Sequence, residues 1–149
     1  MNIHGTEIQS DIEKTKSIYA EIEKMAPADY SCQCNHCQTF HKHLDGLFPQ
    51  EFLDILNQLG INYKYPSEVA YLDEKDGMAV YNGWYHFVGY VENPTVPTLS
   101  GDGVTLDQDF IELSETLSID FTNEEFPHHD IFGQDNLGVI EFIVTINLN

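Results

Sequence analysis

The chain has 149 residues, the size of one ordinary domain, and carries 25 acidic residues against 6 lysines and arginines, a formal net charge of −19 at pH 7. All six of these basic residues are lysines and none follows Lys75, so the chain lacks the cations needed to neutralise phosphates, which excludes nucleic acids and anionic membranes as partners. With 42% hydrophobic residues, the composition predicts a folded acidic protein rather than a disordered one.

Residues 6–26 are expected to form an N-terminal amphipathic helix. Ile8, Ile12, Tyr19 and Ile22 recur at helical spacing, and Thr6 with Gln9 fits a capping box at the start. Pro27 would end this helix, because proline cannot continue the hydrogen-bond ladder.

Residues 30–60 are expected to hold a cysteine-rich loop followed by two more helices. The second helix is expected to start after Cys37 and to end near Gly46. Pro49 suits the first turn of the third helix, and Gly60 suits its C-terminal cap.

From residue 68 to 149 the periodicity changes to that of strands. Asn82-Gly83, between β-rich runs, predicts a hairpin turn, and residues 110–122 and 140–148 read as two longer strands. Helices that precede strands favour an α+β domain over a βαβ fold. We therefore predict a single domain, residues 1–149, in which about three helices pack on an antiparallel sheet of about five strands.

The cysteine cluster Cys32-x-Cys34-x-x-Cys37 is the constellation of greatest chemical interest. Zinc takes four soft or borderline ligands in a tetrahedron, and a tight cysteine turn can supply three, with His41 or His86 as candidates for the fourth. Two alternatives stay open: a redox pair formed by Cys34 and Cys37, and free thiols without a ligand. The acidic surroundings predict that no thiol has a lowered pKa unless a cation is bound.

An aromatic segment, residues 81–90, offers a second candidate site. Trp84, Tyr85 and His86 could line a ligand groove, but the same residues would equally serve core packing on a central strand, with Trp84 and His86 on one face and Tyr85 on the other.

Several motifs together resemble a family of small bacterial proteins of unknown function. They are the cysteine cluster with Phe40, the run Pro49-x-Glu51-Phe52, and Gly83-Trp-Tyr-His-Phe-Val-Gly89. The resemblance spans about residues 30–149 and implies no known activity. It implies that His41 varies within the family, whereas His86 lies inside a matching motif and is the better ligand candidate.

Three hypotheses follow for function. The first is a non-catalytic domain with a zinc site at Cys32, Cys34 and Cys37. The second is an acidic module that binds a basic protein, as an inhibitor or immunity protein would, because negative fields speed association with cationic partners. The third is a thiol-redox or metal-assisted enzyme. The first residues do not resemble a signal peptide, so the expected compartment is the cytoplasm.

Overall fold

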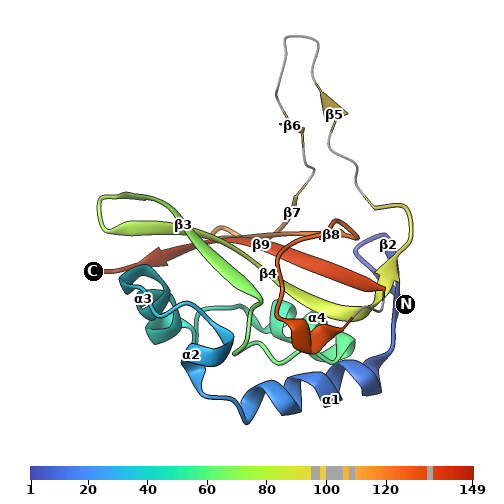
Figure 1. The fold of residues 1–149 in the computed structure, drawn as a ribbon. Helices are drawn as coiled ribbons and strands as arrows, with labels where there is room; N and C mark the ends of the chain where they lie inside the picture. The colour runs from blue at the N-terminus through green and yellow to red at the C-terminus, as the bar shows by residue number, and fades with distance from the viewer. Residues whose placement is uncertain (95–97, 100–105, 108–109, 134–135) are drawn as a thin grey trace.

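The computed structural model describes residues 1–94, 98–99, 106–107, 110–133 and 136–149. Within them, four helices lie on one side of a seven-stranded antiparallel sheet (Figure 1). The α+β class is confirmed, with seven strands instead of about five and four helices instead of about three. The helices are α1 (Ile12–Glu23), α2 (Pro27–Tyr30), α3 (Asn35–His43) and α4 (Gln50–Leu59).

The large sheet has the order β1-β2-β4-β9-β8-β7, and β3 also pairs with β4. Its strands are β1 (Asn2–Ile3), β2 (Thr6–Ser10), β3 (Glu68–Lys75), β4 (Met78–Val91), β7 (Ile111–Ser114), β8 (Leu117–Thr122) and β9 (Leu137–Asn147). A separate two-stranded sheet consists of β5 (Thr98–Leu99) and β6 (Leu106–Asp107), and the single-turn 3-10 helix η1 (Asp130–Phe132) precedes β9.

Strand β4 has two partners along one edge and a gap between them. Its residues 78–84 pair with β3, and residues 89–91 pair with β2, so no strand of the described part of the chain lies beside residues 85–88 on that edge. We call residues 85–88 the β4 gap. Helix α1 satisfies the backbone there: the Tyr19 hydroxyl donates to the His86 carbonyl at 2.8 Å, and the Val88 amide donates to Thr15 Oγ1 at 3.0 Å. A helix thus replaces the missing strand.

The core lies between the helices and the sheet, and Phe142 of β9 is at its centre. Its ring contacts Phe40 of α3 at a centroid distance of 5.9 Å, Phe52 of α4 at 6.2 Å and Tyr85 of β4 at 5.6 Å. All four side chains are at most 1% exposed, so burial of aromatic surface is a main source of stability here.

The expected helix over residues 6–26 is wrong in its first third. Residues 6–10 form β2, where Ile8 opposes Val91 of β4, and α1 begins only after Asp11. Asp11 replaces the expected capping box, because its side chain accepts a hydrogen bond from the Lys14 amide at 3.1 Å. A single apolar residue such as Ile8 is compatible with the periodicity of a helix or of a strand. Pairing with the edge of β4 selects the strand.

The hairpin expected at Asn82-Gly83 is also wrong, because both residues lie inside the continuous strand β4. The turn between β3 and β4 instead uses Asp76 and Gly77, whose φ angles are 55° and 79°. Gly83 has a packing role, because a Cβ at this position would clash with the ring of Phe142. The glycine therefore makes room for the central aromatic ring rather than for a turn.

Residues 110–122, expected as one strand, form the hairpin of β7 and β8. Glu115 and Thr116 lie between the two strands, which explains why Glu115 interrupts the apolar alternation. The third helix, in contrast, closely follows the prediction: Pro49 is the N-cap of α4, and Gly60 caps its C-terminus with a φ of 85°.

Candidate functional site

The three cysteines lie together at the beginning of α3. Their sulfur atoms are all within 4.8 Å of one another, and within the described part of the chain no other group of three histidine, cysteine or carboxylate ligands is so close. Cys32 and Cys34 are exposed, whereas Cys37 is buried. The cluster is therefore open to solvent on one side and anchored in the protein on the other.

Helix α3 begins three residues earlier than expected. Cys34 is its N-cap, with an extended backbone, and Cys37 is its third residue. The Gln38 amide donates to the Cys34 carbonyl at 2.9 Å and closes the first turn. The expectation that this helix starts after Cys37 is thus wrong, because the helix extends back to Asn35.

The first turn of α3 changes the acidity of the thiols in opposite directions. The Cys37 backbone amide, followed by the Cys32 side chain, lowers the pKa of Cys34 to about 7. Burial and the neighbouring thiols raise the pKa of Cys37 to about 12. The expectation that no thiol has a lowered pKa without a cation is therefore wrong for Cys34, because the local backbone outweighs the acidic surroundings.

A cavity of about 270 Å³ lies beside the cluster. Cys32, Cys37 and His41 line it, so His41 shares this cavity with two of the three cysteines. Burial lowers the pKa of His41, which favours the neutral imidazole that can bind a metal. The remaining lining residues come from α2, from the start of β3 and from the segment before η1: Tyr30, Ser31, Pro66, Ser67, Glu68, Val69, Pro127, His128 and His129.

His86 lies on β4, in the gap, and is 1% exposed. Its Nδ1 is 2.7 Å from the hydroxyl oxygen of Ser67, and its ring lies 4.8 Å from the His128 ring and 5.6 Å from the Phe132 ring. Burial, and to a smaller extent His128, lower the pKa of His86 to about 4. His86 is therefore a neutral imidazole at pH 7 with a serine as its partner.

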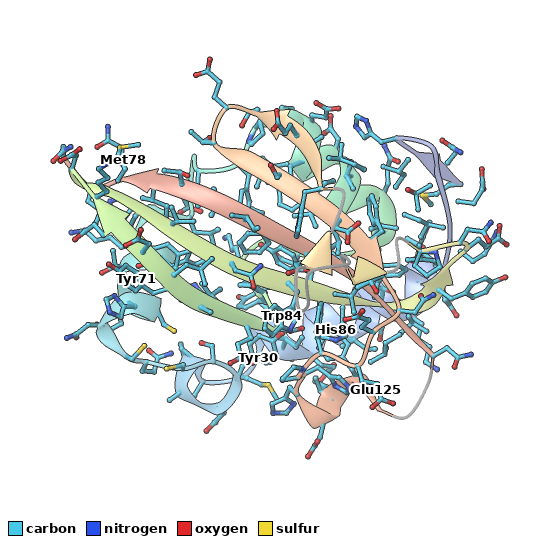
Figure 2. The ribbon with its side chains drawn as sticks, turned by 90° about the horizontal axis from the view of Figure 1, so that it is seen from above. Tyr30, Tyr71, Met78, Trp84, His86 and Glu125 are labelled. Carbon is cyan, nitrogen blue, oxygen red and sulfur yellow. The ribbon has the colours of Figure 1, made fainter. Side chains whose placement is uncertain are left out.

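The other two aromatic candidates point to opposite sides of the sheet. Tyr85 is fully buried on the side of the helices, and its hydroxyl donates to the Tyr63 carbonyl at 2.7 Å. Trp84 is half-buried on the other side, where its indole N–H donates to the Pro127 carbonyl at 3.0 Å and its ring packs on Phe126. Figure 2 shows Trp84 and His86 close to the connection that carries Glu125.

Sequence reasoning did not find Ser67 or the contact of His128 with His86. A single serine has no local signature, and its partner His86 is 19 residues away in the chain. His128 has only His129 beside it as a histidine in the sequence, and only the fold brings its ring to 4.8 Å from the ring of His86. The first contact depends on the gap that β2 and β3 leave along β4, and the second depends on the path of the β8–β9 connection. Local periodicity predicts neither.

No family model matches the chain, and neither the curated proteins nor the solved structures contain a significant match. Among the described residues, none of the helices has both the length and the apolar character required to cross a bilayer.

Proposed function

We propose that Cys32, Cys34 and Cys37 bind a soft metal cation, zinc in the first place. The observation that carries this proposal is the approach of the three sulfurs to within 4.8 Å of one another. Zinc–sulfur bonds of about 2.3 Å in a tetrahedron separate two sulfurs by about 3.8 Å, so a small contraction of the exposed loop would complete the geometry.

Charge supports the same proposal. Each ionised thiol makes ionisation of the next one harder, and the neighbouring thiols contribute to the raised pKa of Cys37. A divalent cation reverses this repulsion, since three thiolates, one neutral histidine and Zn²⁺ together carry a charge of only about −1. Metal binding would therefore convert a cluster that resists full ionisation into a stable site.

For the fourth ligand we propose His41. It lies one helical turn after Cys37 and lines the cavity that Cys32 and Cys37 also border. His86, the other candidate, does not line that cavity, and its Nδ1 already faces the Ser67 hydroxyl. We therefore favour His41, which shares the cavity with two of the three cysteines.

The experiment is a zinc titration of the fully reduced protein, followed by metal analysis after gel filtration. We expect about one zinc per chain, release of protons on binding, and loss of tight binding in Cys37→Ser. His41→Ala should weaken binding, whereas His43→Ala should not. His43 is the matched control because it lies on the same helix with its Nδ1 2.9 Å from the Thr39 carbonyl, and it does not line the cavity.

Two results would contradict this proposal. A zinc content below about 0.2 per chain, with three freely titrating thiols, would exclude the site. Equal loss of affinity in His41→Ala and His43→Ala would exclude His41 as a ligand and show an effect of helix stability instead.

The position of Cys34 and Cys37 in α3 favours a second candidate function, a dithiol–disulfide pair. The exposed Cys34 at the N-cap could attack oxidised glutathione, and the buried Cys37 could then displace glutathione, giving one disulfide and two reduced glutathiones. Equilibration in a glutathione buffer, read as a mass loss of two hydrogens per chain, tests it. Cys32→Ser should keep this oxidation and Cys37→Ser should abolish it. A wild-type protein that stays reduced in oxidising buffer contradicts it.

A further inference from the structure

Ser67 and His86 form a contact that the metal site does not use. Ser67 precedes β3, is half-buried, and lines the cavity of about 270 Å³. His86 lies behind it in the β4 gap, with Nδ1 at 2.7 Å from Ser67 Oγ. Figure 2 shows Tyr30, Trp84 and His86 at the same end of the sheet, where β3 begins. A serine of the cavity wall thus has a buried imidazole directly behind its hydroxyl.

The imidazole is held in one orientation from several sides. The rings of His128 and Phe132 pack on it, and its own backbone carbonyl accepts the Tyr19 hydroxyl. A backbone contact with Phe126 favours the protonated ring. With the ring proton on Nε2, Nδ1 is the acceptor for the Ser67 hydroxyl.

This arrangement contains the three parts of an activated nucleophile: a hydroxyl, a base within hydrogen-bond distance, and a third group that orients the base. We propose that Ser67 is a nucleophile activated by His86 and that the cavity accepts a small carboxylic ester. This inference goes beyond metal binding and does not depend on it, because neither residue belongs to the cysteine cluster.

The reaction divides into two balanced steps. Ser67 Oγ attacks the ester carbonyl while His86 Nδ1 takes the hydroxyl proton; the bond to the alcohol then breaks, and the alcohol leaves with that proton, so that an acyl-Ser67 ester remains. Water then attacks the acyl group, with His86 Nδ1 again accepting the proton. The carboxylic acid leaves, and the proton returns to Ser67.

The cavity defines the class of ester. Its volume of about 270 Å³ is slightly below the range of about 300–1,000 Å³ found for drug-sized ligands, which favours a short acyl chain. Pro66, Val69 and Pro127 give it an apolar wall. Glu68 at the same cavity and the net charge of −19 disfavour an anionic substrate, so we expect a neutral ester.

The experiment is covalent labelling of the native protein with a small alkyl fluorophosphonate, read by intact mass and peptide mapping. Attack by Ser67 forms one phosphorus–oxygen bond and expels fluoride, with the hydroxyl proton passing to His86. We expect one label per chain, on Ser67, and no label in Ser67→Ala. His86→Gln should slow labelling by about 100-fold or more, because general-base assistance contributes that much.

Two control variants separate this site from its surroundings. Ser10→Ala should label at the wild-type rate: Ser10 is also half-buried, but it does not line the cavity, and its hydroxyl donates to the Leu59 carbonyl at 3.1 Å. His43→Ala, which lies outside the cavity wall, should also label normally. The wild-type rate should stay the same when a chelator removes metal, which distinguishes failure of the metal proposal from failure of this one.

Absence of a label on wild-type protein would overturn the assignment, as would labelling that is unchanged in His86→Gln. If circular dichroism shows that His86→Gln does not fold, wild-type protein in urea replaces it. Labelling of Ser67 that continues at the native rate in urea would then overturn the proposal, because an unfolded chain cannot use His86.

Discussion

The two faces of the large sheet are built from different chemistry. On the face toward the helices, Phe142, Tyr85 and Phe87 are fully buried and pack with Phe52 of α4 into one aromatic core. On the opposite face, the neighbouring positions of the same strands carry Asn82, Glu141 and Asp120. Asp120 of β8 lies opposite Glu141 of β9, and the two residues are only 3% and 7% exposed, respectively.

The difference shows where stability and chemistry are separated in this fold. The helix-facing side is apolar and closely packed, so its residues contribute mainly through burial. The opposite side and the β4 gap contain buried polar groups, each of which costs free energy unless it has a partner. Ser67, His86 and the cysteine cluster all lie near the edge where β3 begins, next to the β4 gap, beside the aromatic core but outside it.

Removing the central ring of the aromatic face should have the largest effect. We expect Phe142→Ala to lower the free energy of unfolding by about 3–5 kcal/mol, because it loses buried area and leaves a cavity among Phe40, Phe52 and Tyr85. Urea unfolding followed by circular dichroism measures it. Tyr90→Ala, an aromatic of β4 that is 47% exposed, should change stability by less than about 0.5 kcal/mol. Similar losses of unfolding free energy in both variants would contradict the assignment of Phe142 to the core and Tyr90 to the surface.

The buried histidine should make stability depend on pH. Its pKa is about 4 when folded and about 6.5 when unfolded, so the unfolded chain binds the proton more tightly. Stability therefore falls as pH decreases from about 6.5 to 4. Between pH 7 and pH 5 the contribution of His86 is about 2 kcal/mol. We expect wild type to lose about that much more than His86→Gln over this interval, measured by urea unfolding; equal losses would show that His86 is solvated.

Which parts of the fold follow from the sequence depends on how many independent signals agree. Helix α4 was predicted almost residue by residue because Pro49, an apolar stripe and Gly60 all indicate the same boundaries. The helix predicted over residues 6–10 was wrong because five residues with one buried isoleucine are compatible with a helix or a strand. Pairing with β4, which is distant in sequence, selects the strand. The turn predicted at Asn82-Gly83 was wrong because a glycine can also make room for a packed side chain, here the ring of Phe142.

The candidate site divides in the same way. The cysteine cluster was predicted, because its three members are within six residues and any fold keeps them close. The contact between Ser67 and His86 was not, because it depends on the gap between β2 and β3 along β4. Three expectations stay predictions: a basic protein partner, a cytoplasmic location and the family resemblance. Contacts within a single chain do not test any of them.

The smallest expected effect concerns the polar face itself. The Asn82 side-chain amide donates to Glu141 Oε1 at 3.0 Å and to the Phe142 carbonyl at 2.9 Å. Leucine at this position has a similar size but no donor, so Asn82→Leu deprives two acceptors of this amide and should cost about 1–2 kcal/mol in urea unfolding. Asn57→Leu, on the exposed side of α4, should stay within about 0.5 kcal/mol of wild type. If Asn82→Leu is neutral, water replaces the amide, and the polar face is wetter than the exposures of Glu141 and Asp120 indicate.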